Sequence, residues 1–282
     1  MHRPSTRKRP RRNLIGRLAC IVALVLLIAP HGAAAHEPDR IPDPPARAIR
    51  TEPLEAAQHA AADGGEVVRL HWRLSGFLGL IAGLFVPRTG DALLTFVPLP
   101  DDRVRIEFLV TSPRREGEYY LYGAEVDRRS GSPFVIWNSQ KIKDRRKDSE
   151  ANIDDPQTID YASAIYRLRW HGPDEASAMT IWDRGRSYPA QVIPLGVDTR
   201  SINGTEMQVR GYEIRGADGG EGTSFDDTIW LYFAQDDRST PVEIVGKRGL
   251  IRARIELVGV EGISRDPQAS APPAGPPQAS SR

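Results

Sequence analysis

Pairs of adjacent acidic residues are the first candidates for chemistry in this 282-residue chain. They are Asp101-Asp102, Asp154-Asp155, Asp226-Asp227 and Asp236-Asp237. Two carboxylates that face each other could perform general acid-base catalysis, but neighbours on a strand point to opposite faces. All four pairs lie in stretches typical of turns or of a helix start, where Asp accepts hydrogen bonds from nearby backbone. We therefore interpret them as turn and cap residues and assign no catalytic residue.

The histidines and the short sequence motifs also indicate no catalytic site. His36, His59, His71 and His171 lack both a histidine partner four residues away and the Cys or carboxylate spacing of a zinc site. Beyond the first 35 residues the chain contains no GxSxG, SxxK or HExxH motif. The sequence therefore predicts no metal, no cofactor and no enzyme. An envelope hydrolase, with acids and His171 brought together from distant loops, stays open as the weakest alternative.

An uncharged segment, Gly76–Val86, is a candidate for binding rather than catalysis. Its sequence, GFLGLIAGLFV, has eleven residues, too few to cross a bilayer as a helix. Two interpretations stay open: a buried segment of the core, or an apolar flap at the mouth of a barrel that touches membrane or ligand. The second interpretation makes Phe77, Leu80, Leu84 and Phe85 candidate ligand-binding residues.

Large aromatic residues elsewhere extend this candidate site. Tryptophans fall on four predicted strands and on a predicted helix, a spread that is usual for a core but that would line the hollow of a half-barrel. We include Tyr166, Trp182 and Trp230 as candidate ligand-binding residues. The basic run KIKDRRKD, 141–148, is interpreted either as a solvated strand end and loop or as a head-group contact on anionic lipid. The second interpretation uses Lys141, Lys143, Arg145 and Arg146.

Strands must position most of these residues. In RVRIEFLV, 103–110, apolar residues alternate with charged ones, and IRARIELV, 251–258, repeats the pattern. Such alternation is typical of an antiparallel sheet with one solvated face. Further strands are predicted at 67–73, 92–97, 119–126, 134–142, 178–183, 187–193, 205–214, 228–234 and 241–246, separated by turn-forming residues. Pro189 and Pro194 predict that their strand lies at an edge of the sheet.

One helix is predicted at about 155–170, in DDPQTIDYASAIYRLRW. Asp155 could cap its first amides, and Pro156 suits the first helical position. An apolar stripe then runs from Ile159 to Trp170 on one side of the helix. The predicted fold is therefore mainly β: a curved antiparallel sheet, or open half-barrel, with one covering α-helix.

The first 35 residues are typical of an export signal. Seven basic residues precede the apolar run Leu18–Ala29, and small residues follow at Ala33–Ala35. With twelve residues this run is shorter than the roughly 20 of a membrane anchor, which favours cleavage near Ala35. Cleavage removes seven positive charges from a net +1 and leaves −6, so a nucleic-acid partner is not expected. It also removes the single cysteine, Cys20, so the exported chain cannot use disulfides.

Four regions follow from this division. Residues 1–35 are the cleaved signal, 36–65 a flexible Pro/Ala-rich lead, 66–263 a single β-rich domain, and 264–282 a disordered Pro/Ala/Ser tail. The expected location is the periplasm or the secreted fraction.

Three motifs in the second half of the chain resemble domain-of-unknown-function family 3108. The first is the helix segment with Asp155, Pro156, Tyr166, Leu168 and Arg169; the second is the hairpin with Gly185 and Tyr188; the third is the terminal hairpin with Trp230, Asp236, Asp237, Pro241 and Val242. The resemblance covers roughly residues 67–258. It implies an exported β-rich domain of bacterial envelopes without an established activity, with a half-barrel look similar to periplasmic lipid and lipoprotein carriers. Segment 76–86 departs from it by enlarging the usual short first hairpin.

The sequence therefore favours a non-catalytic binding module that holds an apolar ligand, such as an acyl chain, inside its sheet. The alternative is a structural or interaction protein of the bacterial envelope, tethered by its two ends to a protein partner. Peripheral contact with a membrane is expected if segment 76–86 is a flap.

Overall fold

The computed structural model describes residues 65–75, 88–111, 117–142, 145–217, 225, 227–248 and 251–262. Within these ranges the chain forms thirteen strands and one helix. The strands are β1 (Glu66–Ser75), β2 (Thr89–Leu99), β3 (Arg103–Thr111), β4 (Tyr119–Asp127), β5 (Pro133–Ile142), β6 (Arg145–Asn152), β7 (Thr158–Ile159), β8 (Ser177–Asp183), β9 (Arg186–Ile202), β10 (Thr205–Gly216), β11 (Asp227–Ala234), β12 (Pro241–Arg248) and β13 (Ile251–Glu261), and the helix is α4 (Tyr161–His171).

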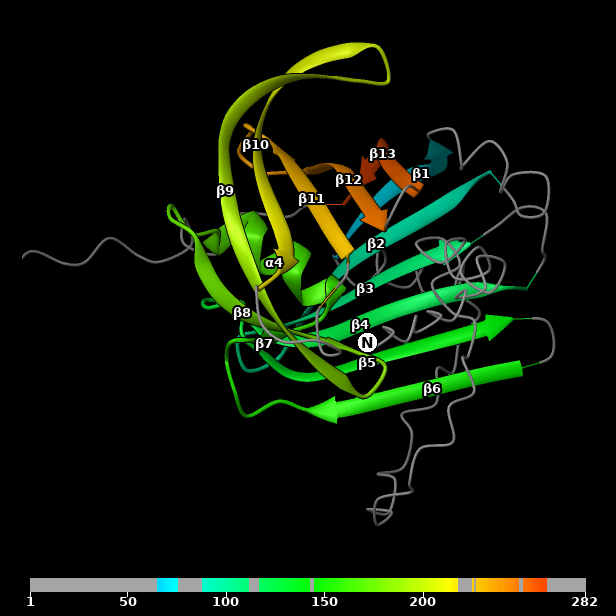
Figure 1. Ribbon diagram of the computed structural model, residues 1–282, viewed down its shortest axis with the longest axis vertical. Coiled ribbons are helices and arrows are strands. Elements are labelled where there is room, and N and C mark those ends of the chain that lie inside the picture. Colours follow the sequence, from blue (N-terminus) through cyan, green and yellow to red (C-terminus); the bar gives the residue numbers. More distant parts are fainter. Residues whose placement is uncertain are drawn as a thin grey trace, which may run out of the picture.

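The strands form a single open sheet that curves around α4 (Figure 1). Its order is β6-β5-β4-β3-β2-β1-β13-β12-β11-β10-β9-β8-β7, and all neighbours are antiparallel except β7 and β8. The first and last long strands, β1 and β13, pair at the centre of the sheet. The predicted fold, a curved antiparallel sheet with one covering helix, is confirmed.

The concave face of the sheet carries the core. Alternate residues of each strand point inward, as the period of two requires, and they are apolar along most strands: Val68, Leu70 and Trp72 on β1, Leu94 and Phe96 on β2, Ile106 and Phe108 on β3, Ala124 and Val126 on β4, Ile229 and Leu231 on β11, and Ala253 and Ile255 on β13. The indole of Trp72 also donates a hydrogen bond of 2.7 Å to the carbonyl oxygen of Thr111. This face therefore builds one continuous apolar interior.

Helix α4 begins at Tyr161, six residues later than predicted. Its cap is Asp160, whose carboxylate accepts a 2.8 Å hydrogen bond from the Ser163 amide, while Ser163 Oγ accepts one of 2.9 Å from the Asp160 amide. This reciprocal pair is a capping box. Asp155 caps a turn instead, accepting from the Gln157 amide and the Thr158 hydroxyl, and β7 lies between that turn and the helix.

A buried ion pair holds the end of α4 against β1. Both guanidinium NH groups of Arg169 contact the Glu66 carboxylate, at 2.8 and 3.0 Å, and neither side chain is more than 1% exposed. Arg169 Nε donates to the carbonyl oxygen of Arg238. The guanidinium carbon also lies 4.7 Å from the ring centroids of Phe96 and Trp170. The position of the helix over the sheet is thus fixed by directional contacts at its C-terminal end.

The prediction that Pro189 and Pro194 mark an edge strand is wrong, because β9 pairs with both β8 and β10. Pro189 opposes Thr180 of β8, and its carbonyl accepts a hydrogen bond from the Ala217 amide. Pro194 lies beside a register shift between β9 and β10, where Leu195 has no opposite residue. A proline without an N–H is tolerated at such an irregularity.

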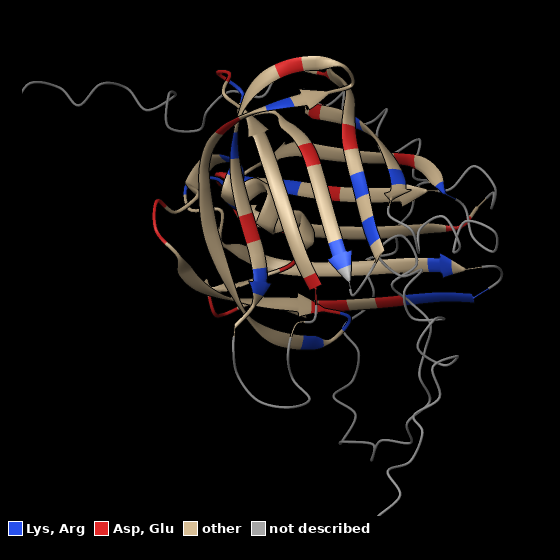
Figure 2. Cartoon of the chain, turned by 45° about the horizontal axis from the view of Figure 1, so that its top comes forward, with Lys and Arg blue, Asp and Glu red and all other residues tan. Residues whose placement is uncertain are grey.

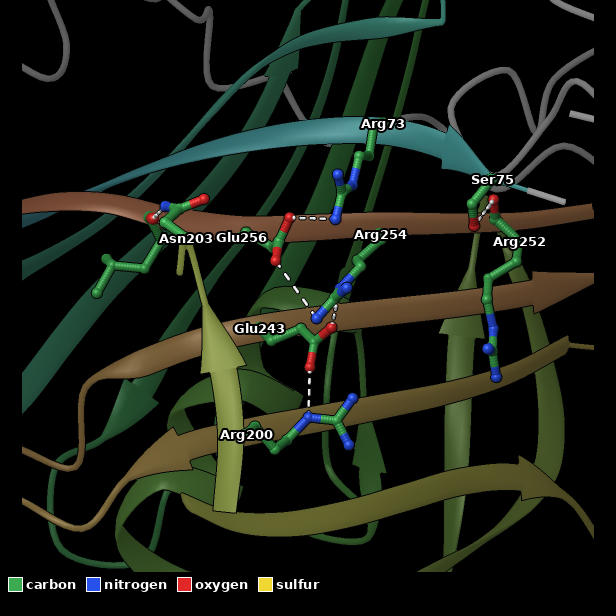
Figure 3. Close-up of polar contacts among 9 residues, drawn as sticks. Arg73, Ser75, Arg200, Asn203, Glu243, Arg252, Arg254 and Glu256 are labelled. Carbon is green, nitrogen blue, oxygen red and sulfur yellow. Dashed lines mark hydrogen bonds and ion pairs between the residues drawn. The ribbon is translucent and has the colours of Figure 1, made fainter. Parts of the chain in front are cut away.

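The long ends of β9 and β10 form an arm, residues 198–209, that folds over the convex face of β11 to β13 (Figures 1 and 3). Beneath it Ile202 and Val209 pack on Val242 in a small second core. Figure 3 shows the ion pairs beside it: buried Glu243 accepts a hydrogen bond from Arg200 at 2.7 Å and another from Arg254. Arg254 also forms an ion pair with Glu256, which in turn pairs with Arg73. The arm is therefore part of the folded body.

Candidate functional site

A cluster of aromatic rings lies on the concave side at the N-terminal end of α4. The rings of Tyr122 and Tyr161 meet edge to face, with centroids 4.8 Å apart. The Phe225 ring lies 6.5 Å from Tyr161 and 6.3 Å from Tyr188. We call these four residues the tyrosine cluster. They come from β4, α4, β9 and the segment before β11, so the cluster exists only because the sheet curls β8 and β9 toward β4.

Local structure explains why each tyrosine points inward. Tyr122 shares its parity on β4 with buried Ala124 and Val126, and Tyr188 shares its parity on β9 with Ala190 and Val192. Tyr161 is the first residue of α4, placed by the Asp160 cap.

Two charged residues border the tyrosine cluster. Asp183 ends β8 and Arg184 follows in the turn to β9, where Arg184 and Gly185 both have positive φ, 51° and 79°. That pair of angles is typical of a two-residue hairpin turn. Asp183 Oδ2 accepts hydrogen bonds from Arg184 Nε at 3.0 Å and from its NH2 group at 2.8 Å. The carboxylate and the guanidinium are thus held together at the tip of the hairpin.

The phenols of Tyr122 and Tyr161 are neutral. Burial raises the pKa of Tyr122 and of Tyr161 well above the usual value, and the negative charge of Asp183 raises both further. The pKa of Asp160, at the start of the same helix, is raised to about 6, since its burial outweighs its hydrogen bonds with Ser163. The phenols of Tyr122 and Tyr161 therefore remain proton donors at neutral pH.

Several deeply buried polar atoms have no hydrogen-bond partner among the residues that the structure describes. Among them are Asn138 Nδ2, Asp183 Oδ1 and Asp160 Oδ2. The residues Asn138 and Asp183 are 7% and 8% exposed. Asn138 lies directly opposite Tyr122 in the register of β4 and β5, so their side chains share the concave face. One donor and one acceptor thus flank the tyrosine cluster.

The tyrosines are deep in the fold and yet not sealed. Tyr122, Tyr161 and Tyr188 are each part of the interior cluster and retain accessible surface, as does Tyr120 on β4. We call this partly accessible inner surface, bordered by these rings and by Asn138 and Asp183, the recess.

The structure places the predicted ligand-binding residues Tyr166, Trp182 and Trp230 outside the tyrosine cluster. Tyr166 is buried on α4, with its hydroxyl donating to the carbonyl oxygen of Arg128, and Trp182 is buried in the same core. Trp230 is a correction: it lies on the convex face of β11, where its indole donates to Glu213 and Arg252 stacks on its ring. It therefore does not line the interior. The remaining four, Phe77, Leu80, Leu84 and Phe85, lie outside the described residues.

The basic run forms a strand that sequence reasoning missed. Arg145 and Arg146 begin β6, an end strand of the sheet, and Lys141 lies opposite Arg146 on β5. Figure 2 shows Lys and Arg gathered at this end of the two strands. Arg146 pairs with Asp148 on the same strand at 3.0 Å. Charges along an end strand discourage pairing with another sheet. Lys143 lies outside the described residues, so a head-group contact stays a prediction.

The acidic pairs mostly form turns, as predicted. Asp101 and Asp102 have positive φ in the turn between β2 and β3, and Asp236 accepts hydrogen bonds from the Arg238 and Thr240 amides. Asp227 is the exception, because it is buried at the start of β11. Within the described ranges, no group of three or more His, Cys, Asp and Glu side chains is arranged to hold a metal ion.

A spanning helix is likewise not found in the part of the chain that the structure describes.

No family model and no curated protein matches this chain. The resemblance to family 3108 therefore stays a prediction.

Several solved structures align with much of this chain at low sequence identity. A β-barrel-like protein of unknown-function family 1849 from Brucella abortus is 10% identical, with a TM-score of 0.45, covering 71% of this chain and 98% of its own. The lipoprotein LppX of Mycobacterium tuberculosis is 12% identical, with a TM-score of 0.29 and coverage of 76% and 95%. The hypothetical lipoprotein YmcC of Escherichia coli is 8% identical, with a TM-score of 0.31 and coverage of 70% and 87%. Scores below 0.5 do not establish a shared fold.

The raised pKa of Asp160 makes stability depend on pH. Because the folded state binds this proton more tightly than the unfolded chain, whose ordinary value is 3.8, the stabilisation is complete below about pH 4 and is lost as the pH rises toward about 6. D160N keeps a capping side chain but does not titrate. We expect the free energy of unfolding of the wild type, relative to D160N, to fall by about 2–3 kcal/mol across that interval. Urea denaturation at a series of pH values measures it.

The matched control is D155N. Hydrogen bonds from Gln157 and Thr158 lower the pKa of exposed Asp155, so its stabilisation is lost as the pH falls instead. A wild-type curve parallel to that of D160N from pH 4 to 6 would contradict the assignment to Asp160.

Proposed function

We propose that this protein is an exported, non-catalytic binding protein that holds an apolar or amphipathic ligand on the concave face of its sheet. The observation that carries the proposal is the recess beside the tyrosine cluster. An apolar face continues from it along β1 to β4, and its polar groups are few and lie together at one end. Binding sites for small amphipathic molecules have this composition, a mostly apolar lining with a few placed polar groups.

The ionisable side chains beside the recess also favour ligand binding over catalysis. Tyr122 and Tyr161 hold their protons because their pKa values are raised, so neither supplies a base at neutral pH. Asp183 is paired with Arg184. These groups suit recognition by hydrogen bonds.

The export signal at 1–35 and its cleavage near Ala35 belong to this proposal, as do the flexible lead, the single domain at 66–263 and membership of family 3108. A role as a structural or interaction protein of the envelope is the second candidate. The exposed apolar residues Leu195, Val197 and Val258 favour a protein contact.

Titration with the apolar dye N-phenylnaphthylamine tests the proposal. The purified protein should bind one dye molecule saturably, with the increase in fluorescence that follows transfer from water to an apolar site. Fluorescence that rises linearly without saturation, at a protein concentration where the fold is intact by circular dichroism, would contradict it.

A further inference from the structure

We infer that the recess selects a ligand whose head group is uncharged and both donates and accepts hydrogen bonds, such as a hydroxyl or an amide on an apolar chain. This inference rests on the proposed function and adds the class of ligand. It starts from Asn138 Nδ2 and Asp183 Oδ1, the buried donor and acceptor that lack a partner among the described residues.

Leaving such atoms unpaired is costly. A buried polar group without a hydrogen bond destabilises a fold by about 1–3 kcal/mol. An apolar residue at the position of Asn138, on the same face as Ile136 of β5, would avoid that cost. The chain instead places an amide there, opposite Tyr122. A ligand that accepts a hydrogen bond from the amide supplies the partner.

Asp183 Oδ1 sets the second requirement on the ligand's head group, a hydrogen-bond donor. Asp183 Oδ2 is already engaged by Arg184, at 2.8 and 3.0 Å, so Oδ1 is the oxygen left to accept. A carboxylate oxygen accepts but does not donate. The ligand must therefore bring a proton donor, which a hydroxyl or an amide carries and an ionised carboxylate or phosphodiester does not.

Charge gives an independent argument against an anionic head. The negative charge of Asp183 raises the pKa of Tyr122 and of Tyr161, and so does that of Asp227, which is buried on the same concave face. The guanidinium of Arg184 is held by Asp183. An anion placed beside Asn138 would meet these carboxylates in a region of low dielectric constant, where like charges repel strongly.

Displacement of bound N-phenylnaphthylamine at neutral pH tests the inference. Monooleoylglycerol and oleate share one acyl chain and differ in the head group. We expect monooleoylglycerol to displace the dye at a concentration about tenfold lower than oleate, the effect of about one good hydrogen bond. The variant D183A should lose this preference, because Asp183 Oδ1 is the acceptor that only a proton donor satisfies. The variant N138L should weaken both lipids alike and leave the dye within about twofold, since an oleate carboxylate also accepts a hydrogen bond from the amide.

The control is N152L, the same substitution at an exposed position of β6, which should leave the affinity for both lipids unchanged. If N138L does not fold, N138A removes the amide without adding bulk and takes its place. Oleate binding as tight as or tighter than monooleoylglycerol would overturn the inference and leave the proposed function standing. An unchanged preference in folded D183A would also overturn it, since Asp183 Oδ1 then accepts no hydrogen bond from the ligand. If the dye itself does not bind, the proposed function has failed.

Discussion

Replacing Arg169 by methionine should lower the free energy of unfolding by about 3–5 kcal/mol, the usual cost of leaving one member of a buried ion pair without its partner. Glu66 would be left without its partner at 1% exposure, between β1 and α4. Arg169 is also the residue that stacks between Phe96 and Trp170. Its loss should loosen the helix that carries Tyr161, and equilibrium denaturation in urea measures the change.

A second variant separates the ion pair from simple packing. In the double variant E66L/R169M neither charge of this pair remains, so most of the stability lost in R169M should return. The matched control is R69M, which breaks the exposed pair of Arg69 and Glu261, with side chains 42% and 54% exposed. Surface pairs of this kind contribute less than about 1 kcal/mol. A loss in R169M as small as that in R69M would show that the buried pair does not hold the helix.

Filling the recess should abolish ligand binding. Ala151 lies on the concave face of β6, opposite Ile136. It is two residues along β6 from Ser149, which lies opposite Asn138. In A151W the indole would occupy the space beside the tyrosine cluster, and we expect the affinity for N-phenylnaphthylamine to fall at least about tenfold, which corresponds to about 1.4 kcal/mol of binding free energy. Dye titration of the folded variant measures the change.

Stability distinguishes an open recess from a filled interior. A large side chain forced into a packed core costs about 1–3 kcal/mol, whereas one that enters open space costs less. We therefore expect A151W to unfold within about 1 kcal/mol of the wild type. The control A178W adds the same ring at an exposed position of β8 and should keep full binding. Wild-type affinity in folded A151W would contradict the proposed location of the ligand.

Most strands could be predicted because each alternates apolar and polar residues over its own length. The inward position of Asn138 could also have been found, since it shares its parity with Ile136 in the predicted strand 134–142. The start of the helix was harder, because Asp155 followed by Pro156 is a strong local start signal. The true cap, Asp160, uses Ser163 where a capping box usually has Glu or Gln.

The site itself depends on long-range curvature. Asp183 borders Tyr122 although β8 and β4 lie far apart in the strand order, and local patterns carry no information on how tightly a sheet curls. Trp230 shows the same limit. Its strand has both faces rich in large apolar residues, so parity alone could not tell that Trp230 points outward to Glu213.

The central claim is that the concave face holds a ligand. Native mass spectrometry of the protein, purified gently from the cells that produce it, tests this claim most directly. The wild type should carry one bound amphiphile, released on denaturation and absent from A151W. A wild-type mass equal to that of the bare chain, together with no saturable dye uptake, would contradict the claim.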